Sequence, residues 1–125
     1  MQAGAMPVLR GRVESGQADL AHWMRLHALK YSAATGLHLF PGSLNVRLDA
    51  PYELPEERIR LSADEVGVAV NLVAALAFGR PIFIFRTDAD DAKGPEQRRL
   101  IELLSDLRLR EVYDLADGDL VEVAV

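Results

Sequence analysis

The clearest structural signal in this sequence is PGSLNVRLD, at residues 41–49. It opens on a Pro-Gly turn and continues as an alternation of apolar and polar residues, the pattern of a β-strand with one buried face. Since side chains two residues apart share a face of a strand, Ser43, Asn45 and Arg47 lie together on the open face. A hydroxyl, a carboxamide and a guanidinium side by side suit a hydrated Mg²⁺ ion that carries nucleotide phosphates. A half-solvated strand with a polar outer face has the same pattern, so these residues alone leave both interpretations open.

Length and composition limit the classes of protein to which the chain can belong. Its 125 residues, half of them hydrophobic, are enough for one domain with its own core. We expect residues 1–7 to form a flexible leader and residues 8–125 a single domain. The absence of cysteine excludes disulfides and thiolate metal sites and fits a cytoplasmic location. The net charge of −5 and the scattered arginines argue against nucleic acid as a partner, and no apolar run is long enough to predict a membrane span.

The residues ahead of this stretch predict a strand and then a helix. Residues 8–13 alternate as a strand, and the Ser-Gly pair that follows Glu14 indicates a turn. Residues 19–35 carry apolar side chains at helical spacing. In that helix we expect Trp23 and Met24 to belong to the core. The three histidines of the chain do not have the spacing of a zinc site.

The second half of the chain is rich in strand patterns. Residues 82–85 predict a strand buried on both faces, and residues 120–125 predict a final alternating strand after a tight turn. Residues 67–77 are apolar apart from Asn71, and residues 100–104 fit either a strand or a helix, so both segments stay open. The three carboxylates of residues 88–91 are expected in a solvated acidic loop. Several short strands with one or two helices predict a mainly β fold, a small β-barrel.

Several sequence blocks, taken in order, resemble the CTP-dependent riboflavin kinases, a mostly archaeal family with a compact cradle-loop barrel. The blocks are G-x-V-x-S-G at residues 11–16, PGSLNVRL at residues 41–48, Arg86-Thr87, Ile101-Glu102, LRLRE at residues 107–111 and L-x-DGD at residues 115–119. The likeness covers residues 8–125. It implies a six-stranded riboflavin-kinase-like barrel with a strand at residues 100–104. Some members carry a helix-turn-helix domain in front, which we do not expect in this chain.

The resemblance also implies an activity and a set of site residues. Members of the family transfer a phosphoryl group from CTP to the 5′-hydroxyl of riboflavin, giving FMN and CDP. Ser43 and Asn45 are the implied ligands of a Mg²⁺ cofactor, and Thr87 and Glu102 are the implied flavin contacts. The implied nucleotide contacts are Ser15, Gly16, Gln17, Leu107, Arg108, Leu109 and Arg110. No residue is assigned as a general base.

Departures from the family pattern leave alternatives open. The segment after the first Ser-Gly, residues 17–20, contains no glycine, so its backbone amides have less freedom to surround phosphates. Residues 88–94 are acidic, and Ser105-Asp106 replaces an Ala-Pro pair. The hypotheses are therefore an active riboflavin kinase that uses CTP or another nucleotide, a non-catalytic relative that binds a flavin or a nucleotide, and a structural barrel without a ligand. The sequence does not predict the oligomeric state.

Overall fold

The computed structural model describes residues 7–16 and 20–125, so most of the predicted leader lies outside the described part of the chain. The described chain is mainly β. Its strands are β1 Val8–Glu14, β2 Leu44–Leu48, β3 Ile59–Leu61, β4 Val70–Ala77, β5 Arg80–Thr87, β6 Leu100–Leu104 and β7 Leu120–Ala124. Its helices are short: α1 Leu20–Leu26, α2 Ala28–Thr35, α3 Ala63–Val66, α4 Asp88–Asp91, α5 Leu109–Val112 and one 3-10 turn, η1 Gln97–Arg99. In these described ranges, no helix has the length and apolar character needed to cross a membrane.

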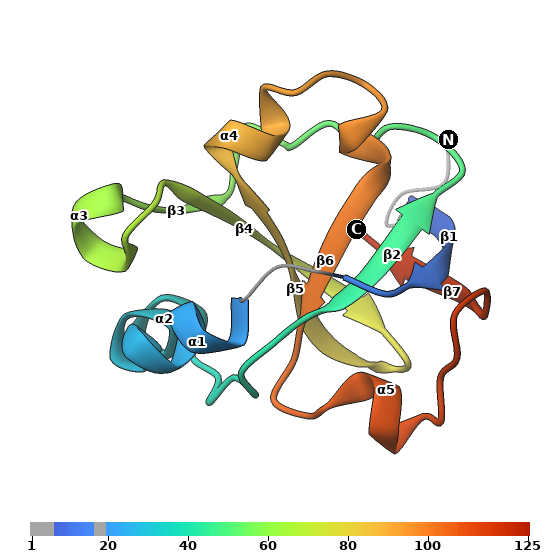
Figure 1. Ribbon diagram of the computed structural model, residues 1–125, viewed down its shortest axis with the longest axis horizontal. Helices are drawn as coiled ribbons and strands as arrows, with labels where there is room; N and C mark the ends of the chain where they lie inside the picture. The colour runs from blue at the N-terminus through green and yellow to red at the C-terminus, as the bar shows by residue number, and fades with distance from the viewer. Residues whose placement is uncertain (1–6, 17–19) are drawn as a thin grey trace.

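Six of the strands close into an antiparallel barrel (Figure 1). Neighbouring strands follow the order β4, β5, β6, β2, β1, β7, and the ring closes where Ala124 of β7 pairs with Leu76 of β4. β3 pairs with β4 outside the ring. Closure pairs the strands of the ring on both sides, which removes the exposed edges that an open sheet would have. The predicted six-stranded barrel is confirmed.

The interior of the barrel is filled by one face of each strand. In β2 the burial alternates as the sequence predicts, with Leu44, Val46 and Leu48 buried while Asn45 and Arg47 lie on the outer face. The other strands add inward side chains from the same core, including Val13, Val73, Ile82, Ile84, Ile101, Leu103, Val121 and Val123. Burying one such side chain stabilises the fold by roughly 1.5–3 kcal/mol, so a register slip that turned this face outward would be costly.

A second core lies outside the ring, on the side of the sheet that faces α1, α2 and α3 (Figure 1). It contains Met24, Tyr31, Leu61, Val66, Val70, Leu72, Phe83, Phe85 and Leu104. In β5, Ile82 and Ile84 therefore point into the barrel while Phe83 and Phe85 point into the second core. This confirms the prediction that residues 82–85 are buried on both faces. β4 also contributes to both cores, which explains why residues 67–77 show no alternation although they contain a strand.

Three local predictions are wrong. The helix expected over residues 19–35 is two helices, because the backbone leaves helical geometry at His27, where φ is −115° and ψ is 27°. Trp23 is not a core residue, since it is 49% exposed while its neighbour Met24 is buried. The acidic loop expected at residues 88–91 is the one-turn helix α4, because the hydroxyl of Thr87 caps it by accepting a hydrogen bond from the amide of Asp90.

One buried arginine holds two long connections against the barrel. Arg86 donates hydrogen bonds to the carbonyl oxygens of Tyr52 at 2.7 Å and Arg98 at 2.8 Å, and it pairs with Asp91 at 3.1 Å. The Arg86 side chain is 3% exposed, so these partners replace the water that its guanidinium has lost. The connection before β3 and the connection that contains α4 are thereby fixed to the end of β5, next to Thr87.

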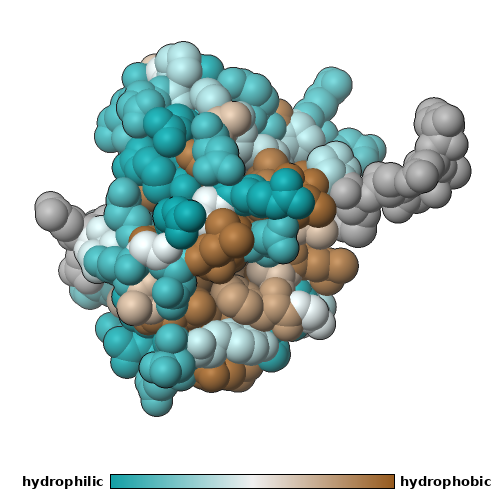
Figure 2. Space-filling view, turned by 90° about the vertical axis from the view of Figure 1, so that its right-hand side faces the viewer, coloured by the Kyte–Doolittle hydropathy of each residue, from teal (hydrophilic) through white to brown (hydrophobic). Residues whose placement is uncertain are grey.

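The seam at which the barrel closes carries apolar side chains on its outer surface. Ala124 lies between Val8 of β1 and Leu76 of β4, and these two side chains are 47% and 43% exposed. Figure 2 views the molecule from the side of β1 and β7 and shows apolar residues gathered in the middle of that face. The described ends of the chain also meet here, because the amide of Val125 donates a 2.9 Å hydrogen bond to the carbonyl of Pro7.

Candidate functional site

A row of polar side chains crosses the outer face of three neighbouring strands. Asn45 of β2 lies opposite Glu14 of β1 and Glu102 of β6 in the antiparallel register. Residues that pair across strands project to the same face, so two carboxylates flank one carboxamide. The hydroxyl of Ser43 lies 3.1 Å from Oδ1 of Asn45 and 3.0 Å from Oε1 of Glu102. The two residues predicted as Mg²⁺ ligands are thus within hydrogen-bonding distance of one another, and Glu102 joins them.

Three adjoining hollows follow this row and together form what we call the groove. The arginine hollow, of about 380 Å³, is lined by Arg25, Phe40, Ser43, Leu107, Arg108 and Arg110, among others. The oxygen hollow, of about 410 Å³, is lined by Glu14, Ser15, Gly16, Ser43, Asn45 and Glu102, among others. The apolar hollow, of about 190 Å³, is lined by Trp23, Tyr31, Val66, Phe85, Thr87 and Glu102, among others. Ser43 borders the first two hollows and Glu102 the last two, so the hollows adjoin at these two residues.

Every described residue that the sequence predicts for the site lines this groove. Leu107, Arg108, Leu109 and Arg110 lie in the arginine hollow, Ser15, Gly16 and Asn45 in the oxygen hollow, and Thr87 in the apolar hollow, with Ser43 and Glu102 at the junctions. Gln17 lies outside the described residues. The fold therefore brings together segments from both ends and the middle of the chain, and the individual roles remain predictions.

The two segments predicted to contact the nucleotide are tied together by Asp117. Its carboxylate accepts a 2.7 Å hydrogen bond from the hydroxyl of Ser15 and a 2.9 Å hydrogen bond from Nη2 of Arg110. These bonds, the one from Ser15 first, lower the pKa of Asp117 below its usual range. The carboxylate is therefore ionised at neutral pH, and the protein itself holds Ser15 and Arg110 at the edge of the oxygen hollow.

Gly16 occupies a position where a side chain does not fit. A Cβ atom at this residue would lie 2.3 Å from Nδ2 of Asn45. The chain after β1 consequently passes directly over the carboxamide. The backbone at Gly16 therefore lies close against Asn45, and it restricts where the carboxamide can point.

Glu102 connects the polar row to the apolar hollow. Burial raises the pKa of its carboxyl group, the hydrogen bond from Ser43 opposes this shift, and the nearby charge of Asp90 adds to it. Burial, with a smaller contribution from the charge of Glu102, raises the pKa of Tyr31 to about 12. Tyr31 is therefore a neutral phenol, and Glu102 is the acidic group that faces both polar and apolar surroundings.

The oxygen hollow offers oxygen atoms as ligands for a metal ion. The hydroxyl of Ser43, the carboxamide oxygen of Asn45 and the carboxylate of Glu102 are the hard ligands that Mg²⁺ prefers. The negative charge of Glu14 is compensated by Arg47, which donates two hydrogen bonds of 3.1 and 3.0 Å to its carboxylate. Among the described residues, no group of three or more His, Cys, Asp or Glu side chains is arranged to hold a metal ion. The donor set therefore fits a Mg²⁺ ion held by few protein ligands and largely by phosphates.

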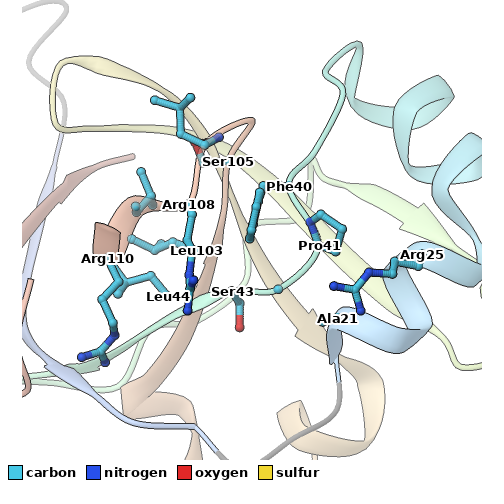
Figure 3. Close-up of a pocket in the computed structure, with 13 residues that line it drawn as sticks. Ala21, Arg25, Phe40, Pro41, Ser43, Leu44, Leu103, Ser105, Arg108 and Arg110 are labelled. Atoms are coloured by element: carbon cyan, nitrogen blue, oxygen red, sulfur yellow. The ribbon is translucent and has the colours of Figure 1, made fainter. Parts of the chain in front are cut away.

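Helix α1 also lines the groove, with residues that the sequence does not predict for the site. Arg25 lies on one side of the arginine hollow and Arg108 and Arg110 on the other, with Ser43 between them (Figure 3). Trp23 forms part of the wall of the apolar hollow. The helical spacing assigns Trp23 to the core and gives no sign of Arg25, because neither residue is part of a motif.

The chain is similar to several known proteins along nearly its whole length. No protein-family model matches it. A riboflavin kinase from Methanocella arvoryzae is 29% identical over 129 residues, which cover 98% of this chain and 58% of that protein. A riboflavin kinase from Pyrobaculum arsenaticum is 31% identical, with 94% and 60% covered, and one from Staphylothermus marinus is 22% identical, with 96% and 93% covered. The chain thus spans about three fifths of the length of the first two relatives.

Proposed function

The chain is a distant homologue of the archaeal riboflavin kinases, and we propose that it transfers a phosphoryl group from a nucleoside triphosphate to the 5′-hydroxyl of riboflavin. CTP is the donor that the sequence resemblance implies. The observation that carries the proposal is the order of the hollows, cationic, then oxygen-lined, then apolar. A kinase for an aromatic acceptor needs these three environments in this order, for the phosphates, for the reacting groups and for the ring.

The arginine hollow supports binding of the triphosphate. Arg25 approaches from α1, and Arg108 and Arg110 approach from the opposite side (Figure 3). Phosphoryl transfer depends mainly on positioning and on neutralising the charge of the phosphates. Residues 17–20 carry no glycine with which to surround phosphates. Side-chain cations from two helices would therefore take over part of the task that backbone amides perform in a glycine-rich loop.

The oxygen hollow supports the binding of Mg²⁺ by Ser43 and Asn45. A bound Mg²⁺ ion would partly neutralise the charge that develops on the transferred phosphoryl group. The protein's contribution is to fix the oxygens, since Ser43 hydrogen-bonds to its neighbours and Gly16 confines the carboxamide of Asn45. Groups held in place in this way need little reorganisation during the reaction.

The apolar hollow supports binding of the flavin ring. Its lining is mainly aromatic and aliphatic, and the two predicted flavin contacts, Thr87 and Glu102, stand at this end of the groove. A ring placed there would direct its ribityl chain past Glu102 towards Ser43. The hydroxyl groups of that chain would then find a hydrogen-bonding carboxylate at the junction of the two hollows.

A non-catalytic, flavin-binding relative is the second candidate, and one observation favours it. Asp90 of the acidic helix α4 lines the apolar hollow, and its charge acts on Glu102. Carboxylates at the rim would oppose a phosphorylated ligand more than the uncharged riboflavin. A protein that binds riboflavin without phosphorylating it would tolerate both this acidic rim and the absence of glycine from residues 17–20.

The experiment that tests the proposal measures FMN formation. Purified protein is incubated with riboflavin, Mg²⁺ and one of CTP, ATP, GTP or UTP, and FMN is quantified by chromatography. We expect FMN with CTP, and loss of FMN in the double variant Ser43→Ala/Asn45→Ala. Ser32→Ala on α2 is the matched control, because Ser32 lines none of the three hollows.

The other outcomes separate the alternatives. If FMN is formed only with another nucleotide, the proposed kinase activity stands with a different donor. The altered residues 17–20 would then account for the change of donor. Riboflavin binding without FMN from any donor would replace the kinase by the non-catalytic relative. If the protein neither binds riboflavin nor forms FMN, the hypothesis that remains is a structural barrel without a ligand.

A further inference from the structure

The apolar hollow differs from its neighbours in the nature of its walls. Trp23, Tyr31, Val66 and Phe85 surround it, and polar groups stand at its rim. At about 190 Å³ it is smaller than the roughly 300–1,000 Å³ of a pocket that encloses a drug-sized ligand. The hollow therefore fits one flat end of a ligand, whose remaining part continues along the groove past Glu102.

Trp23 is the exposed aromatic side chain of this wall. Tyr31 and Phe85 are 3% and 4% exposed and belong to the second core, whereas Trp23 is 49% exposed. An indole has the largest apolar surface of any side chain, and leaving half of it in contact with water gives up stabilisation that burial would provide. Aromatic side chains in such positions are typical of ligand contacts, because a bound ring restores the lost burial.

The protein fixes the plane of the Trp23 ring. The imidazole of His27 stacks against the indole, with the planes 3° apart and the centroids 6.3 Å apart. The ring of His22 meets it edge-on at 5.6 Å. Gly67 lies alongside, where an added Cβ would be 3.4 Å from the indole. A ring held in this way loses little conformational freedom when a ligand stacks on it, which favours tight binding.

We propose that Trp23 binds the isoalloxazine ring of riboflavin by stacking, and so makes the flat ring the part of the substrate that sets its affinity. The inference rests on the proposed function, which supplies a flavin as the ligand. Loss of an aromatic stacking contact changes the Kd of a ligand by about tenfold. A ligand that carries the ribityl chain without the ring, such as ribitol, should bind far more weakly, whereas lumichrome, which carries the ring without the chain, should still bind.

The test measures riboflavin and lumichrome binding by calorimetry without nucleotide, for the wild type, Trp23→Leu and Trp23→Phe. We expect the Kd for both ligands to rise about tenfold in Trp23→Leu and about two- to threefold in Trp23→Phe, which keeps a smaller ring. Trp23 is the only tryptophan in the chain, so it is the only indole that can quench flavin emission on contact. Bound riboflavin should therefore be brighter in both variants than in the wild type.

Leu26→Ala is the matched control, because Leu26 is on the same helix, is 61% exposed and lines none of the three hollows. Circular dichroism checks that each variant is folded. Unchanged Kd values and unchanged flavin emission in Trp23→Leu would overturn the inference, even if FMN is formed. Weaker and brighter flavin binding in that variant, together with no FMN from any donor in the wild type, would support the inference and overturn the kinase. A wild type that binds neither ligand would overturn both.

Discussion

At the scale of single residues, the groove depends on a contact between a backbone and a carboxamide. We predict that Gly16→Ala lowers kcat/KM for FMN formation about 100-fold, because the new Cβ would lie 2.3 Å from Nδ2 of Asn45 and would displace the carboxamide. Riboflavin affinity should be unchanged, since Gly16 lines the oxygen hollow and not the apolar hollow. Steady-state kinetics and calorimetry check the two parts, and wild-type kinetics in this variant would contradict the prediction.

Arg25 gives a second prediction at this scale. Arg25→Ala should lower kcat/KM for the donor nucleotide about 10- to 100-fold, because a hydrogen bond to a charged group contributes about 1.5–3 kcal/mol. The KM for riboflavin should stay near its wild-type value. Arg10→Ala is the matched control, since Arg10 is an exposed arginine paired with Glu122 outside the groove. Equal kinetic constants in the two variants would show that Arg25 does not contribute to nucleotide binding.

At the scale of the elements, Asp88 joins α4 to two strands. Its carboxylate accepts a 2.9 Å hydrogen bond from Arg60 of β3 and a 2.8 Å hydrogen bond from Asn71 of β4. These bonds, the one from Arg60 first, lower the pKa of Asp88 in the folded protein. The folded state therefore binds fewer protons than the unfolded state, so the stabilisation is present above the unfolded pKa and is lost as the pH falls through the folded pKa.

We predict that Asp88→Asn lowers the free energy of unfolding at pH 7 by no more than about 1 kcal/mol, since the ion pair is half exposed. The difference from the wild type should shrink as the pH falls below the unfolded pKa of about 3.9, and it should vanish once the pH lies below the lowered pKa of the folded protein. Urea denaturation across this range measures it. Asp64→Asn is the control, because no hydrogen bond of the Asp64 side chain is found among the described residues. A difference that does not depend on pH would contradict the prediction.

The elements that could be predicted are those with one buried face. Residues 43–49 alternate because one side of β2 faces the barrel interior and the other faces the groove. Residues 67–77 stay ambiguous, because β4 lies between two cores and needs apolar residues on both faces. The break between α1 and α2 at His27 could not be predicted, because no proline or glycine lies near it in the sequence. Residues 100–104 could be predicted as a strand through the family resemblance, whereas their periodicity alone also fits a helix.

The site could be predicted to the extent that it lies in motifs. The segments around Ser15, Ser43 and Arg108 are short patterns, and the barrel brings them into one groove. Arg25 and Trp23 could not be predicted, because an amphipathic helix does not reveal which of its exposed residues face a hollow and which face bulk water. That distinction depends on how α1 packs against the barrel.

At the scale of the whole molecule, the two cores share strands β4 and β5, so neither can be lost alone. We predict that urea unfolding followed by Trp23 fluorescence, which reports on α1, coincides with unfolding followed by far-UV circular dichroism. Ile84→Ala inside the barrel should lower the free energy of unfolding by about 2–5 kcal/mol and shift both transitions together. Two separate midpoints would show that the helical layer and the barrel unfold independently.

The hydrogen bond between Val125 and Pro7 has a topological consequence. A closed ring of strands in which the described ends of the chain meet has no strand that must come first, so the chain can be opened in one loop and joined between residues 7 and 125. A circular permutant that links residue 125 to residue 7 and opens the chain between Lys93 and Gly94, in the connection between α4 and β6, would preserve every strand pair of the ring. Such a rearranged gene would encode the same groove, since β1, β2 and β6 would keep their neighbours.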